Sequence, residues 1–180
     1  PISMSKCDVI IKATEEYKKR YALYAIATLS EKMGNKEKEK PRRDSLYALA
    51  LDSYSIILEM DQKGENFLDN QIINVADIYV KLDQFEKAAP LYNKVIENKR
   101  SQSEKAMVMT EVAKKYEKQG SYDNAIGYGL KAFAIYEKQK DYNELVSLCS
   151  FLSKIYYTKD NNQKAEEYAK KMEEYEKKIK

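Results

Sequence analysis

The sequence predicts an all-α protein, built as an α-solenoid of about four helix hairpins. The composition combines 34% charged and 43% apolar residues with only five glycines and three prolines in 180 residues, which is typical of helical chains. Apolar residues recur at spacings of three and four along most of the chain, as amphipathic helices require. One phrase, a helix followed by a very short turn and a second helix, recurs with a period of 37 to 40 residues.

The clearest copy of this phrase contains the stretch YEKQGSYDNAIGY, residues 116–128. Gly120 lies just past the first helix, where a residue in the left-handed conformation closes a helix without a Cβ penalty. Ser121 follows at the position where a hydroxyl caps the next helix. The stretch therefore predicts a helical hairpin with a very short connection.

The phrase recurs in VADIYVKLDQFEKAAPLY and in FLSKIYYTKDNNQKAEEYA. The three copies share a tyrosine on the first helix and an alanine on the second, namely Tyr79, Tyr116 and Tyr156, then Ala88, Ala125 and Ala165. A fourth, degenerate copy precedes them, with Ala50 and Tyr54 on its second helix and a longer loop, KEKEKPRRD, after Gly34. Repeats of this period indicate helix pairs that stack to bury their apolar faces.

The periodicity sets the expected helix boundaries. We expect helices at about 8–33, 43–62, 67–81, 84–98, 102–119, 122–139, 142–158 and 161–178. Ser101 and Glu104 form a capping box at the start of the fifth helix, and Asp141 is expected to cap the seventh. The whole chain, 1–180, is expected to be a single helical repeat domain, with copies at about 20–62, 67–98, 102–139 and 142–178. Because the sequence begins at Pro1 rather than Met, we expect it to be part of a longer chain.

Charge and motifs argue against several functional classes. The 32 basic and 29 acidic side chains leave a net charge of +3, so neither nucleic acid nor an anionic membrane is the expected partner. No apolar run approaches the roughly 18 residues of a membrane span. Histidine is absent, which removes the commonest general base and metal ligand. With no phosphate loop, CxxC pair or GxSxG motif either, we expect no enzymatic activity, no cofactor and no metal.

The two cysteines do not suggest a disulfide framework. Cys149 lies among Leu145, Leu148, Leu152 and Ile155 on one helical face, so we expect a thiol buried in the core. Cys7 lies near an end of the chain that is expected to fray.

The repeated phrase resembles the tetratricopeptide repeat (TPR) over about residues 20–180. The resemblance rests on a small residue and an aromatic on the first helix, then an aromatic and an alanine after the turn: Ala76, Ala113 and Ser153; Tyr79, Tyr116 and Tyr156; Phe85 and Tyr122; Ala88, Ala125 and Ala165. The early tryptophan and the closing proline of the family are missing, and Asn162 replaces the turn aromatic of the last copy. Repeats of 37 to 40 residues resemble the longer variety found in bacterial sensor and regulator proteins.

The resemblance implies a right-handed superhelix whose concave groove, lined mainly by the first helix of each pair, binds a protein or peptide. Carried over residue by residue, it predicts these groove residues: Tyr21, Tyr24, Asn70, Asn74, Asp77, Lys81, Thr110, Lys114, Lys118, Ser147, Lys154 and Tyr157. The alternative interpretation is that polar residues on this face are only solvated.

The carboxylate clamp of TPR co-chaperones is not expected here. Only Asn74 fits its pattern, since Tyr24, Thr28, Met107 and Glu111 stand where the other clamp residues should be, and Glu111 would repel a carboxylate. A row of lysines (Lys81, Lys114, Lys118 and Lys154) instead favours an extended segment of acidic character.

Two functions therefore stand after the sequence is read. The first is a binding module, as the ligand-binding or adaptor part of a bacterial regulatory or signal-transduction protein. The alternative is a structural assembly element, in which the repeats and the C-terminal helix mediate self-association. Tyr175 and Ile179 have no following repeat to cover them, so they either end a solvated cap or lead into a partner helix. A monomer or weak dimer is expected, and the cytoplasm is slightly favoured over a membrane-anchored external domain.

Overall fold

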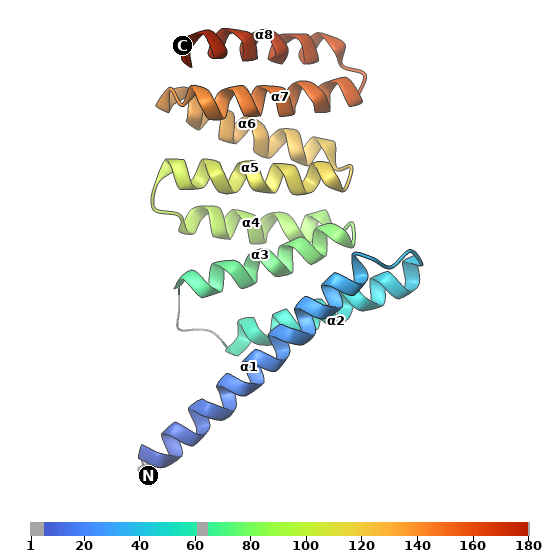
Figure 1. Cartoon of the computed structure of the whole chain (residues 1–180), viewed down its shortest axis with the longest axis vertical. Helices are drawn as coiled ribbons and strands as arrows, with labels where there is room; N and C mark the ends of the chain where they lie inside the picture. The colour runs from blue at the N-terminus through green and yellow to red at the C-terminus, as the bar shows by residue number, and fades with distance from the viewer. Residues whose placement is uncertain (1–5, 61–64, 180) are drawn as a thin grey trace. The chain divides into compact units, whose positions relative to one another are not determined.

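The chain folds into α-helices joined by short turns (Figure 1). The computed structural model describes residues 6–60 and 65–179, and within them it contains eight α-helices and no β-strand. The helices are α1 (Lys6–Gly34), α2 (Lys40–Met60), α3 (Glu65–Lys81), α4 (Phe85–Asn98), α5 (Gln102–Lys118), α6 (Tyr122–Gln139), α7 (Tyr142–Thr158) and α8 (Asn162–Ile179). The predicted all-α, solenoid-like class is confirmed, and each helix boundary lies within three residues of its expected place.

The chain forms two compact units, Pro1–Leu91 (unit 1) and Tyr92–Lys180 (unit 2), and the boundary between them falls inside α4. Within unit 1, α1 packs on α2 and α2 on α3; within unit 2, α5 packs on α6, α6 on α7 and α7 on α8. The sequence also predicts a single continuous domain and a right-handed superhelix. Both depend on how the two units are placed, so both stay predictions.

The short turns share one hydrogen-bonding pattern. The backbone N–H of Ser121 donates to the carbonyl of Tyr116 at 2.9 Å, while that of Gly120 donates to Glu117 at 2.9 Å. Gly120 has φ +73°, so this is the Schellman closure that the sequence predicts. The carbonyls of Tyr79, Tyr136 and Tyr156 accept the equivalent bonds at the ends of α3, α6 and α7.

Non-glycine residues take the left-handed position at these three other turns. Asp83, Lys140 and Asp160 have φ between 56° and 59°. A residue with a Cβ pays about 1–2 kcal/mol for this conformation. The Lys140→Gly substitution is therefore expected to raise the free energy of unfolding by about 1 kcal/mol, and Gly120→Ala to lower it by a similar amount.

Urea unfolding followed by circular dichroism measures both changes. The matched control is Lys138→Gly, two residues earlier inside α6, which is expected to cost about 0.5–1 kcal/mol because glycine weakens a helix interior. If Lys140→Gly destabilises as Lys138→Gly does, Lys140 is not held in the left-handed conformation.

Two of the three expected helix caps are confirmed. Ser101 and Glu104 form the predicted capping box, and the hydrogen bonds that Glu104 accepts from the Ser101 and Arg100 backbones lower its pKa. Asp141 accepts a hydrogen bond from the Glu144 N–H at 3.3 Å. The expected Ser121 cap is wrong, because the side chain makes no bond to the helix backbone. Its hydroxyl instead accepts a hydrogen bond from Asn124 Nδ2 at 2.9 Å.

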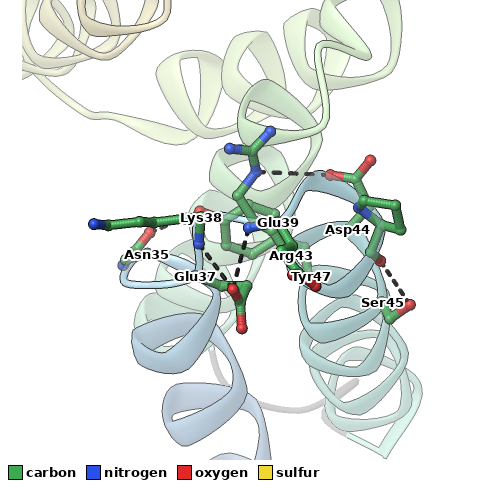
Figure 2. A network of polar contacts seen from close by, with 9 residues as sticks. Asn35, Glu37, Lys38, Glu39, Arg43, Asp44, Ser45 and Tyr47 are labelled. Atoms are coloured by element: carbon green, nitrogen blue, oxygen red, sulfur yellow. Dashed lines mark hydrogen bonds and ion pairs between the residues drawn. The ribbon is translucent and has the colours of Figure 1, made fainter.

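The connection between α1 and α2 is shorter than the expected loop, because α2 already begins at Lys40. Pro41 lies in the first turn of α2, where its missing N–H removes no helical bond. The Glu37 carboxylate accepts hydrogen bonds from the N–H groups of Lys38 and Glu39, at 2.9 and 3.1 Å (Figure 2). Across the turn, Tyr47 Oη donates to Asn35 Oδ1 at 3.0 Å.

Each unit has its own hydrophobic core. The core of unit 1 contains Ala27, Tyr47, Ala50, Tyr54, Ile57, Val75 and Ile78. The core of unit 2 gathers around Ala132, Phe133, Leu148, Cys149, Leu152, Tyr156 and Tyr168. Cys149 is fully buried, as expected, and burial raises the pKa of its thiol to about 11. The side chain of Cys7 lies outside the described part of the chain.

The expectation for the end of α8 is half wrong. Tyr175 is buried, because its ring stacks on Tyr142 of α7 at 5.9 Å and contacts Phe133 of α6 at 6.3 Å. Its hydroxyl donates to Glu137 Oε1 at 3.0 Å. Of the two residues expected to be uncovered, only Ile179 is exposed, and Tyr175 belongs to the core.

Candidate binding surface

Half of the predicted groove residues lie on the first helices of unit 2. Thr110, Lys114 and Lys118 are on α5, and Ser147, Lys154 and Tyr157 are on α7. All except Thr110 are exposed. The Thr110 hydroxyl donates to the Ala106 carbonyl of its own helix at 2.9 Å, so it is the least available of the six.

The lysines of this surface lie among glutamates. Lys154 Nζ binds Glu117 Oε1 at 3.0 Å and thereby joins α7 to α5. Lys114 Nζ binds Glu111 on its own helix at 3.2 Å. Lys118 is exposed and makes no ion pair within the described residues. Two of the three lysines in unit 2 are therefore already paired.

Large apolar side chains are exposed on the same surface. Met107 on α5 is 60% exposed and Tyr157 on α7 is 71% exposed. Met107 lies four residues before Glu111 on α5, and Tyr157 lines a cavity together with Lys154. The sequence analysis noted Met107 only as a missing clamp cation, although an apolar residue at a groove position is itself a signal of contact with a partner.

The other predicted groove residues lie in unit 1 and are more strongly engaged. Lys81 Nζ on α3 binds Glu31 Oε1 on α1 at 2.6 Å, while Glu31 Oε2 accepts a hydrogen bond from Tyr54 Oη at 3.3 Å. Burial, followed by the nearby Glu31 carboxylate, raises the pKa of Tyr54. The Lys81 ammonium also lies 5.5 Å from the ring centroid of Tyr47. Lys81 thus holds α3 to α1 and is part of the packing of unit 1.

The remaining members in unit 1 differ in exposure. Asn70 is exposed, Asp77 is half-buried, and Asn74 Nδ2 donates to Gln71 Oε1 at 3.5 Å. Tyr21 and Tyr24 are both exposed, and the Tyr24 ring also meets the Tyr54 ring edge-on at 6.2 Å. The predicted residues therefore form two surfaces, one on each unit, and the single groove that would join them stays a prediction.

A shallow cavity of ≈ 410 Å³ lies between α7 and α8 in unit 2. Its lining includes Ser153, Lys154, Tyr157, Ala165, Ala169 and Met172. The Ser153 hydroxyl donates to the Ala165 carbonyl at 2.8 Å, which draws the two helices together at its floor. The sequence analysis did not predict this cavity, since it depends on how the two helices pair.

Two further classes of site were sought over residues 6–60 and 65–179. No group of three or more histidine, cysteine, aspartate or glutamate side chains could hold a metal ion there. No helix in this part is long and apolar enough to cross a membrane.

The fold and its exposed faces define an all-α helical-repeat protein. Residues 74–179 match the family model described as Domain of unknown function (DUF6340), and the chain belongs to this family. No curated protein matches the chain. Among solved structures, the crystal structure of BtubC (BKLC) from P. vanneervenii is similar, with a TM-score of 0.45 and 14% sequence identity, over 87% of this chain and 73% of that one.

Proposed function

We propose that the chain is a non-enzymatic, TPR-like module that binds a peptide or protein segment on the first helices of unit 2. The observation that carries this proposal is the exposure of Met107 and Tyr157 on the same two helices that present Lys114, Lys118 and Lys154. Methionine and tyrosine are enriched at protein interfaces, where large side chains become anchors once water is excluded.

The charges define the partner further. Three lysines face two glutamates on this surface, so a segment with an apolar or aromatic side chain flanked by acidic residues fits best. Because Glu111 and Glu117 already bind Lys114 and Lys154, an acidic partner competes with them. Charge then contributes mainly to the association rate and to specificity, and the apolar anchors contribute most of the affinity.

The biological role we propose is that of a ligand-binding or adaptor part in a bacterial regulatory or sensor protein. The support for this role is the resemblance of the 37- to 40-residue repeats to those of such proteins. The fold adds no support of its own, because a repeat fold does not determine a ligand.

Peptides selected from a random library displayed on phage test the proposed surface. Binders recovered with the wild-type chain are expected to lose about tenfold or more in affinity for Lys114→Glu/Lys118→Glu at low salt. Met107→Ser/Tyr157→Ser is expected to weaken them further, and at all salt concentrations. The melting temperature should change little, because all four side chains are exposed.

The matched control is Lys138→Glu/Lys170→Glu, which makes the same change in net charge at exposed positions of α6 and α8. Peptide binding should survive in this variant. Binding that falls equally in both charge-reversed variants would reflect net charge only, and the face of α5 and α7 would then be merely solvated.

A further inference from the structure

Within each unit, one row of residues on a first helix is buried by the preceding hairpin. On α7 the row is Leu148, Leu152 and Ile155, spaced by four and three residues and all buried. Leu152 lies directly on α6, because a Cβ added to Gly129 would stand 3.1 Å from Leu152 Cδ2. The hairpin of α5 and α6 thus offers a groove that receives the row of α7.

The same row can be located on α3 and α1 by the small residue that marks each first helix. These small residues are Ser153 on α7, which is half-buried, and Ala76 on α3 and Ala27 on α1, which are fully buried. The row of α3 then consists of Gln71, Val75 and Ile78, which are all buried in unit 1. The row of α1 consists of Ala22, Ile26 and Leu29, and Met33 extends it by another four residues.

The row of α1 is exposed, unlike those of α3 and α7. Ile26, Leu29 and Met33 are 42%, 59% and 54% exposed, and Ala22 is exposed as well. Leu49 and Ile56 on α2 are also exposed apolar residues. An exposed apolar row of this kind marks a contact surface.

A groove that could receive such a row lies on the α7–α8 hairpin of unit 2. The offset of 40 residues between Ala125 and Ala165 places Ala169 where Gly129 stands and Met172 where Ala132 stands. Ala165, Ala169 and Met172 line the cavity of ≈ 410 Å³ between α7 and α8. The α7–α8 face is therefore the empty counterpart of the α5–α6 groove.

The α1 row and the α7–α8 face both lack the charged residues that join α7 to the α5–α6 hairpin. Inside unit 2, Lys154 of α7 binds Glu117 of α5, and Lys159 after α7 binds Asp123 of α6. At the α1 row, Thr28 and Met33 stand in the places of the two lysines. At the α7–α8 face, Tyr157 and Gln163 stand in the places of the two acids. Both partners of each ion pair are lost together, so neither pair leaves one charged partner behind at a contact between the two faces.

From this match we infer that copies of this chain associate head to tail, with the α1 row of one copy on the α7–α8 face of the next. The two faces are different surfaces, so each added copy leaves one of each kind free. Such a heterologous contact produces an open series or a ring rather than a closed twofold dimer.

Sedimentation velocity of the full chain tests the association. The mean mass should rise steadily between micromolar and near-millimolar concentrations. Leu29→Glu/Met33→Glu blocks the α1 row, and Ala169→Arg blocks the α7–α8 face; each variant alone should stay monomeric. An equimolar mixture of the two should form a one-to-one dimer and nothing larger, because only one intact pair of faces remains.

Circular dichroism verifies that each variant folds, and Glu166→Arg, at an exposed position that lines the same cavity, replaces Ala169→Arg if the latter does not. Met107→Glu, an equally exposed apolar position outside both faces, should associate as the wild type does. Three results would overturn the inference: a wild type that is monomeric throughout, variants that still associate alone, or a mixture that stays monomeric. Peptide binding on α5 and α7 is measured separately, and its failure would not affect this result.

Discussion

The Tyr175→Glu variant is expected to lose about 3–5 kcal/mol of unfolding free energy, because it places a carboxylate in an apolar site. Tyr175 is only 7% exposed and lies between the rings of Tyr142 and Phe133. Burial and the Glu137 carboxylate raise the pKa of Tyr175 to about 12. A glutamate there would lose the ring contacts, and Glu137 would repel it.

Ile179→Glu provides the control on the same helix. Ile179 is 47% exposed, so the change is expected to stay within about 0.5 kcal/mol. Tyr175→Phe should fall between the two, with a loss of about 1–2 kcal/mol for the hydrogen bond to Glu137. Urea unfolding followed by circular dichroism measures all three, and equal stability of Tyr175→Glu and Ile179→Glu would contradict the packing of α8.

The burial of Tyr175 is a feature that the repeat pattern of the sequence does not predict. The sequence pattern assigns each second helix to the repeat that follows, so the last helix is expected to be uncovered. In unit 2, however, Tyr175 of α8 reaches back to Phe133 and Glu137 of α6. A contact of this kind depends on the angle between hairpins, which apolar spacing does not encode.

Local features were the most predictable. Helix boundaries follow from apolar spacing, from the capping box at Ser101 and from Gly120, all of which act within a few residues. The left-handed conformation of Lys140 could not be predicted in the same way. Lys140 has φ 56° because the hydrogen bond from the Asp141 N–H to the Tyr136 carbonyl holds the turn. Its own preference is for a different conformation.

The candidate surface was predictable as a set of exposed positions but not as a set of interactions. The spacing places Lys81 and Lys154 on first helices, as the structure does. Their partners, Glu31 and Glu117, are 50 and 37 residues away in sequence, and single-sequence patterns carry no information on such pairs. The lysine row is therefore less available to a ligand than the sequence suggests.

The Leu152→Ala variant is expected to lose about 3–4 kcal/mol, the cost of truncating a fully buried leucine. Gly129→Ala alone should change stability by at most about 1 kcal/mol, since its gain in helix propensity is offset by crowding against Leu152. In the double variant the new methyl group enters the space that Leu152 leaves. The double variant should therefore be about 1–2 kcal/mol more stable than the sum of the single changes predicts.

Gly127 supplies the matched control for this cycle. It lies on the same helix, but a Cβ added there meets nothing within 4 Å. Gly127→Ala should raise stability by about 0.5–1 kcal/mol through helix propensity, and its effect should add to that of Leu152→Ala within about 0.5 kcal/mol. If Gly129→Ala is equally additive with Leu152→Ala in urea unfolding, α7 does not lie against α6 at this point. The α5–α6 hairpin would then have no groove for α7, and the head-to-tail contact, which is inferred by analogy with that groove, would lose its basis.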